Sequence, residues 1–132
     1  MKSEEMNLPE ELKYTKEHQW VKQDGDYLIS GITDFAQSEL GDIVYIDIES
    51  LDEEVDVDAV YGSIEAVKTV SDLFLAVSGE IVEFNEELEV EPELVNKDPY
   101  GKGWIIKIKP QDINDMSLLL NAKDYQELVA AK

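Results

Sequence analysis

Four segments of this chain share one design, a glycine followed by an apolar run that is rich in β-branched residues. Branched side chains pack well on a pleated surface, so such runs favour β-strands. The intervals between the glycines are uneven, which excludes a solenoid built from a regular repeat. The pattern predicts a compact sheet protein whose short strands are joined by turns. The four segments are residues 41–48, 62–67, 79–88 and 103–109.

Two further stretches carry strand signals. Residues 20–21 and 27–29 are apolar, and they flank Asp24-Gly25, a dipeptide typical of hairpin turns. Residues 55–58 read Val-Asp-Val-Asp. This strict alternation predicts a strand with one packed face and one face in solvent.

Helical signals are fewer. Asp34 and Gln37 stand three residues apart, as at many helix N-termini, and Gly41 follows as a C-cap. Residues 112–120 are expected to form another short helix. Residues 89–103 contain two prolines and two glycines, which predicts a structured loop.

The segment 121–132 predicts a helix at the C-terminus. Asn121 is a favourable N-cap, and Asp124 lies in the first turn. One face of this helix is apolar; it carries Tyr125, Leu128 and Val129. The expected architecture is therefore mainly β with short helices at the margins.

Charge limits the partners of this chain. It has 132 residues, predicted to form one domain over 1–132, with 31 acidic residues against 11 lysines, no arginine and a formal net charge of −20. Nucleic acid and anionic membranes would repel it, so neither is expected as a partner. A basic partner surface would attract it, although solubility alone also explains the charge. The first residues lack the features of a targeting signal, so we expect a cytoplasmic protein.

Enzyme and metal sites find little support in the residue inventory. The chain has no cysteine and one histidine, His18, for which a structural or exposed position is favoured over catalysis. Residues 47–58 are rich in acids but lack the central glycine of an EF-hand calcium loop. A solvated strand edge is the better interpretation, and we expect no metal site.

Lys68 is the only positive charge in residues 59–77, a span that is too long for one strand. Glu65 lies three residues before it and Asp72 four residues after it. A lysine within a strand usually faces solvent and guards against aggregation. A lysine displayed at a bend can instead be acylated and become the tether of a cofactor. Local sequence leaves both interpretations open.

Five blocks of the chain, in order and in spacing, resemble the H proteins of the glycine cleavage system. Together they cover nearly the whole sequence, and one of them contains Lys68 between Glu65 and Asp72. The blocks are residues 12–21, 31–48, 62–73, 77–88 and 92–110.

The resemblance implies a barrel-sandwich hybrid of the lipoyl/biotinyl-domain type, with Lys68 at a hairpin tip and lipoate attached to it by an amide bond. Glu65 would help the lipoate-attaching enzyme recognise the tip. The protein would be a carrier and not an enzyme, since the cofactor and the partners do the chemistry. It would take an aminomethyl group from glycine decarboxylase, a pyridoxal-phosphate enzyme, to the tetrahydrofolate-dependent aminomethyltransferase. Dihydrolipoyl dehydrogenase would then reoxidise the dithiol.

The resemblance also implies a shelter for the loaded arm, formed by Glu17, Gln19 and Asp72. The family usually has a glutamate where this chain has Gln19. A hydrogen bond to a charged group contributes about 1.5–3 kcal/mol, against about 0.5–1.5 for a neutral one. The hypothesis is a weaker grip on the charged amine, partly restored by Glu17.

The resemblance places the bend at Lys68 itself, and we expect cross-strand packing of Ile64, Val67 and Val70 to hold it. Four other functions are alternatives to this one. A lipoyl carrier of the same family could serve a lipoate relay or another pathway. A biotin carrier is disfavoured because Val67 and Thr69 stand where that family has methionine. An unmodified acidic interaction domain is the third, and a small hydrolase has little support.

Overall fold

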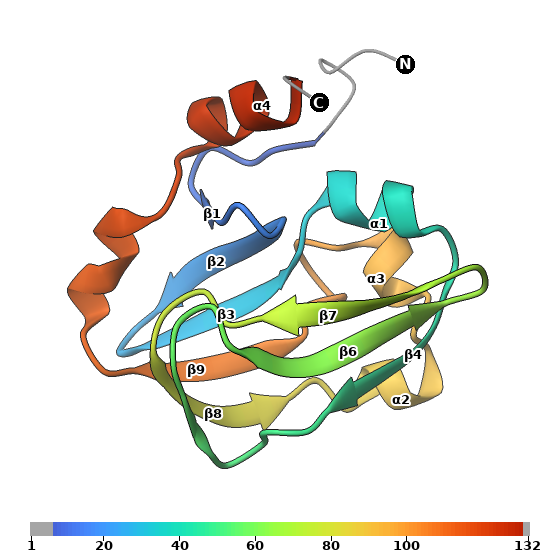
Figure 1. Cartoon of the computed structure of the whole chain (residues 1–132), viewed down its shortest axis with the longest axis horizontal. Coiled ribbons are helices and arrows are strands. Elements are labelled where there is room, and N and C mark those ends of the chain that lie inside the picture. Colours follow the sequence, from blue (N-terminus) through green and yellow to red (C-terminus); the bar gives the residue numbers. More distant parts are fainter. Residues whose placement is uncertain (1–6, 131–132) are drawn as a thin grey trace.

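The computed structural model describes residues 7–130 (Figure 1). Strands dominate the chain, and short helices lie between and after them. In chain order the elements are β1 (Lys13–Tyr14), β2 (Gln19–Asp24), β3 (Tyr27–Ile32), α1 (Asp34–Leu40), β4 (Ile43–Ile48), β5 (Glu54–Val55), β6 (Val60–Ala66), β7 (Val70–Phe74), β8 (Gly79–Phe84), α2 (Glu87–Val90), α3 (Leu94–Lys97), β9 (Ile106–Pro110), the 3-10 helix η2 (Ile113–Leu118) and α4 (Ala122–Ala130).

The strands form two antiparallel sheets. The larger has the order β1-β2-β3-β9-β8-β5, and the smaller has the order β4-β6-β7. Side chains from both sheets meet in one buried cluster, so the core lies between them. The predicted architecture, mainly β with short helices and a C-terminal helix, is confirmed. The cluster includes Leu28, Ile81, Ile106 and Ile108 of the larger sheet and Ile46, Ile64 and Leu73 of the smaller.

Each of the four glycine-led segments overlaps one strand: β4, β6, β8 and β9 in chain order. Close backbone approach explains two of the glycines. A Cβ atom at Gly62 would overlap the carbonyl oxygen of Asp47, and one at Gly79 would overlap that of Lys109. In both cases the glycine lets a neighbouring strand lie close.

The first hairpin forms as predicted. Asp24 of β2 pairs with Tyr27 of β3, which leaves Gly25 and Asp26 as a two-residue loop. Gly25 has φ of 64°, a left-handed conformation that glycine adopts at little cost. A local sequence rule therefore suffices to place this turn.

Helix α1 lies where the sequence predicts it, but its cap is different. The Ala36 N–H donates to the Thr33 side chain at 3.1 Å, so Thr33 is the N-cap and not Asp34. Asp34 instead accepts a hydrogen bond from the Gln37 side chain at 2.8 Å. Gly41 ends the helix with φ of 84°, as predicted.

Helix α4 confirms the helix predicted for the C-terminal segment as far as Ala130; residues 131–132 of that segment lie outside the described residues. The Asp124 N–H donates to the Asn121 side chain at 2.8 Å. Tyr125 is fully buried and stacks on Tyr14 of β1, with ring centroids 4.9 Å apart. The helix thus closes a second buried cluster, which also contains Trp20.

Two local predictions are wrong. Only the first residue of the segment 55–58 belongs to a strand, because the chain then turns and the Ala59 N–H donates to the Asp56 carbonyl at 3.1 Å. Val57 is consequently 48% exposed and not packed. The predicted loop 89–103 contains α3 and the end of α2, since single helical turns tolerate the flanking prolines. The short helix predicted in residues 112–120 is present as η2.

Candidate functional site

Lys68 lies at the tip of the β6–β7 hairpin, which projects beyond the neighbouring strands (Figure 1). Glu65 pairs with Val70, and the Ala66 N–H donates to the Thr69 carbonyl at 2.8 Å. The chain therefore reverses over Val67 and Lys68, as the resemblance implies. The Lys68 side chain is exposed and makes no hydrogen bond or ion pair within residues 7–130.

Backbone hydrogen bonds hold this tip. No residue of the turn has a positive φ, so β-branched residues fit it without strain. The Val67 N–H donates to the Asp42 carbonyl at 3.0 Å, which ties the tip to the chain just before β4. The expected packing of three side chains is wrong for two of them. Ile64 is buried, but Val67 is 70% exposed and Val70 is 62% exposed.

Glu65 lies on the outer face of the smaller sheet, away from the core. It is exposed, whereas its neighbours Ile64 and Ala66 are buried, as expected from the alternation of side chains along a strand. Its carboxylate is thus available to a partner that approaches Lys68 from outside.

A cleft of about 240 Å³ opens between β7, α1 and the start of β2. The three predicted shelter residues, Glu17, Gln19 and Asp72, all line it. The fold brings them together although Glu17 and Asp72 are far apart in the sequence. Ser71 and Asp72 belong to the strand that leaves Lys68, so the cleft begins close to the tip. We call it the arm cleft.

Two chemical parts make up the arm cleft. Its floor is apolar, and exposed carboxylates of Glu17, Glu39 and Asp72 lie around it. Such a cleft suits a ligand with an apolar chain and a cationic end. Glu39 was missed from the sequence, where an acid on a short helix carries no signal of its own. The apolar lining residues are Ile32, Phe35, Ala36, Leu40, Ile64 and Leu73.

Gln19 is buried in the cleft wall, and both ends of its amide are engaged. Its nitrogen donates to the carbonyl of Phe74 on β7, and its oxygen accepts from the Tyr61 hydroxyl at 3.1 Å. Burial raises the pKa of Tyr61, so this hydroxyl stays protonated and able to donate. The amide thus joins β2 to β6 and β7. The hypothesis of a weaker grip on an amine stays a prediction, but the structure adds that this amide is a structural link.

His18 lines the arm cleft and belongs to a hydrogen-bond network behind it. Its Nδ1 lies 2.8 Å from the Tyr125 hydroxyl, which also lies 2.8 Å from the Thr33 hydroxyl. Burial raises the pKa of Tyr125 to about 12, so the phenol stays neutral in this network. Since Thr33 caps α1, the network joins α4 to a wall of the arm cleft.

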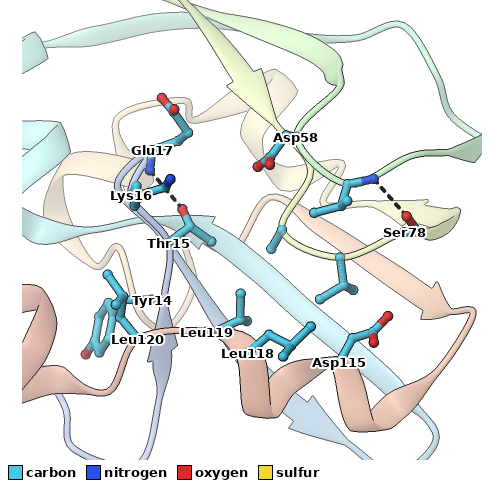
Figure 2. A pocket seen from close by; sticks show the side chains of 13 residues that line it. Tyr14, Thr15, Lys16, Glu17, Asp58, Ser78, Asp115, Leu118, Leu119 and Leu120 are labelled. Carbon is cyan, nitrogen blue, oxygen red and sulfur yellow. Dashed lines mark hydrogen bonds between the residues drawn. The ribbon is translucent and has the colours of Figure 1, made fainter.

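A second pocket of about 300 Å³ is lined by residues of β1, of η2 and of the chain around Asp58 and Ser78 (Figure 2). Leu118, Leu119 and Tyr14 contribute to its apolar lining, and Asp58 lies at its far side. Glu17 lines both pockets, but Lys68 lines neither. Of the two, only the arm cleft takes residues from the strand that follows Lys68 directly.

Other kinds of site are not found in the described part of the chain. Residues 7–130 contain no group of three or more His, Cys, Asp or Glu side chains that could hold a metal ion. None of the helices among these residues is long and apolar enough to cross a membrane.

Known proteins resemble this chain closely. The family model described as "Glycine cleavage H-protein" matches residues 12–132. The glycine cleavage system H protein of Bacteroides fragilis is 54% identical over 126 residues, covering 96% of this chain and all of that protein. The H protein of Halalkalibacterium halodurans is 52% identical over 124 residues, covering 94% of this chain and 97% of that protein.

A solved structure shows the same fold. The crystal structure of a glycine cleavage system H protein from Mycobacterium marinum superposes with a TM-score of 0.84 at 33% identity, covering 93% of this chain and 99% of that one. The prediction of a lipoyl-type barrel-sandwich hybrid is confirmed. With a family match over residues 12–132 and relatives above 50% identity, the chain belongs to the glycine cleavage H-protein family.

Proposed function

We propose that this chain is the lipoyl-bearing shuttle of the glycine cleavage system and that lipoate is attached to Lys68. One observation carries the proposal: in a member of the H-protein family, a lysine without a hydrogen bond or ion pair in residues 7–130 stands at a hairpin tip, and the strand that follows it lines a cleft with apolar side chains and exposed carboxylates. We propose that the chain is one cytoplasmic domain and acts as a carrier, not as an enzyme. When bound, lipoate supplies the dithiolane that holds the aminomethyl group.

The residues around Lys68 fit such a group. The Nζ atom is exposed, so an attaching enzyme can reach it, and acylation removes a charge that no ion pair in residues 7–130 requires. On the strand that follows Lys68, the cleft begins at Ser71, the second residue of β7 and the third residue after Lys68. The arm cleft takes residues from the strand that follows Lys68, so we propose it as the surface on which a long acyl chain rests.

The arm cleft would shelter the loaded arm in two ways. Its apolar floor would cover the alkyl chain and exclude water. Glu17, Glu39 and Asp72 would attract the cationic amine, each contributing at most about 1 kcal/mol, because exposed charges are screened. Gln19 would keep the wall in place through its hydrogen bonds to Phe74 and Tyr61.

The proposed partners follow from the shuttle role. Glycine decarboxylase would load the arm, aminomethyltransferase would unload it, and dihydrolipoyl dehydrogenase would reoxidise it. A lipoate-attaching enzyme would act first. The net charge of −20 would steer the chain toward basic surfaces on these enzymes.

A reconstituted assay tests the function. The lipoylated chain is combined with purified glycine decarboxylase, and glycine-dependent exchange of labelled CO₂ is measured. We expect exchange that requires both the chain and its lipoyl group. The unlipoylated chain is the control, since it has the same fold and charge pattern but no dithiolane.

A second candidate is a lipoyl carrier in a relay or another pathway. It is favoured by Gln19, whose amide is engaged inside the wall and offers no charge to an amine. The same assay separates the two roles. Suppose that the fully lipoylated chain supports no glycine-dependent CO₂ exchange although the decarboxylase is active. That result would contradict the shuttle role and favour the relay role.

A further inference from the structure

The outer side of the hairpin tip carries an exposed apolar surface. Tyr45 of β4 pairs with Glu65 of β6, which pairs with Val70 of β7, so the three form one row across the smaller sheet. Val67 lies in the turn beyond this row, next to Lys68. We call these four residues the tip face: Tyr45, Glu65, Val67 and Val70.

The apolar side chains of the tip face are largely exposed to solvent. Tyr45 is 56% exposed, Val67 is 70% exposed and Val70 is 62% exposed. Single exposed apolar residues are common, but neighbouring ones often mark an interaction site. Here they surround a modifiable lysine on a chain with a net charge of −20. The turn does not need them for its shape, because backbone hydrogen bonds to Asp42 and Thr69 hold it.

The tip face is separate from the arm cleft. Ile64 and Ser71 line the cleft, whereas the next residues along the two strands, Glu65 and Val70, do not. Tyr45 and Val67 do not line the cleft either, so it shares none of its lining residues with the tip face. An arm that rests in the cleft would therefore leave the tip face open.

We propose that the tip face is the docking surface for the enzyme that acylates Lys68, an inference that rests on the function proposed above. That enzyme must bring Nζ to its activated acyl donor, for example a lipoyl adenylate. Neutral Nζ attacks the acyl carbon, the amide bond forms, and AMP and a proton leave. Nζ belongs to Lys68, the residue next to Val67. An enzyme that reaches Nζ therefore also covers the surface around Val67.

The partners that act on the far end of the arm do not need to reach Nζ. They react with the dithiolane, which the lysine and its acyl chain hold away from the tip. The tip face therefore fits an enzyme surface with an apolar patch for Tyr45, Val67 and Val70. A basic side chain on that enzyme would lie opposite Glu65, which lies between Tyr45 and Val70 in the row.

The test compares aspartate substitutions within and outside the tip face. Unmodified chain is incubated with purified lipoate–protein ligase, ATP and lipoate, and acylation is followed by intact mass. Val70→Asp and Tyr45→Asp are expected to lower kcat/KM by about tenfold each, the size of a substantial interface contact. Val60→Asp and Val90→Asp add the same charge at exposed valines away from the tip, 45% and 83% exposed. These controls should stay within about twofold of the unsubstituted chain.

A second measurement separates recognition from fold and from later steps. Each variant is driven to full acylation with excess ligase, and its reduction by dihydrolipoyl dehydrogenase and NADH is measured. We expect unchanged rates and an unchanged unfolding temperature. Val70→Thr, which keeps the shape of the side chain but adds a hydroxyl, gives a milder loss of acylation if the aspartate variant folds poorly.

The outcomes are distinct. If tip-face and control variants are acylated equally, and Lys68 is modified in the unsubstituted chain, the proposed docking role of the tip face is wrong and the shuttle role still stands. If the tip-face variants are acylated normally but reduced more slowly, the surface binds the dehydrogenase, and the proposed docking of the acylating enzyme is again wrong. If the unsubstituted chain is not acylated on Lys68, both the inference and the proposed function fall.

Discussion

The β2–β3 and β6–β7 hairpins are both antiparallel, yet their turns differ in residue type and in backbone conformation. The first uses Gly25 at φ of 64°, in a loop of two small or polar residues. The second contains Val67 and Lys68, with no glycine and no positive φ. A turn that presents one long side chain cannot place glycine at that position. The β6–β7 turn instead depends on a contact from outside the hairpin, the hydrogen bond from Val67 to Asp42.

The difference separates turns that local sequence determines from turns that the surrounding fold determines. A glycine turn is stable because of its own backbone preference. The lysine turn is stable because β4 and the buried Ala66 hold its base. This explains how an exposed, reactive amine can stand at a defined place beside the arm cleft. The following changes test this contrast, from the largest expected effect to the smallest.

Lys68→Arg should abolish acylation of the chain, because a guanidinium stays protonated and offers no nucleophile. Lys22→Arg on β2, in the other hairpin, should leave acylation at the wild-type level. Intact mass after incubation with ligase, ATP and lipoate measures both. An adduct on Lys68→Arg would show that the modified lysine lies elsewhere.

Gln19→Glu should destabilise the fold by about 2–3 kcal/mol at neutral pH. The introduced carboxylate would be buried and could not donate to the Phe74 carbonyl, which leaves two acceptors facing each other. Gln23→Glu is the matched control, since Gln23 lies on the same strand and bonds a carbonyl at the exposed turn. Its effect should be within about 0.5 kcal/mol. Urea unfolding followed by tryptophan fluorescence gives both values.

The pH dependence sharpens this test. Burial raises the folded-state pKa of the introduced carboxyl above its unfolded value of about 4.3. The stability deficit is therefore full above that folded-state pKa and shrinks as the pH falls through it, because the protonated acid can donate to Phe74. A deficit that is independent of pH would mean that the side chain has moved into solvent.

Gly25→Ala should destabilise the fold by about 1 kcal/mol, since alanine is disfavoured at a positive φ. No atom lies within 4 Å of the added Cβ, so the cost comes from the backbone alone. Thermal or urea unfolding measures it. A loss of several kcal/mol would mean that this turn also depends on long-range contacts.

Thr69→Gly at the other turn should cost only about 0.5 kcal/mol, through the greater freedom of the unfolded chain. Thr69 is exposed and has an ordinary φ, so glycine relieves no strain there. The acylation rate should change by less than about twofold. A stabilising effect would contradict an unstrained lysine turn.

The comparison also shows what could be predicted from sequence. The Gly25 turn, the Asn121 cap and the four glycine-led strands follow from local rules, and the structure confirms each. The cap of α1 was misplaced by one residue, because both Thr33 and Asp34 are good caps and only geometry chooses between them.

The candidate site depends on longer-range contacts, which one sequence does not reveal. The hydrogen bond from Gln19 to Phe74 spans 55 residues, and Glu39 reaches the arm cleft only because the fold brings α1 and β7 to the same cleft. The alternation at 55–58 failed because a turn can also alternate polar and apolar residues. The resemblance to a family supplied Glu17, Gln19 and Asp72, and the structure brings them together in one cleft.

The most direct test is the mass of the peptide that contains Lys68. The chain is purified from its own cells grown with lipoate, digested, and the peptide is sequenced by mass spectrometry. We predict a lipoyl group in amide linkage on Lys68 and on no other lysine. An unmodified Lys68, a biotinyl group in its place, or lipoate on a different lysine would contradict the carrier role.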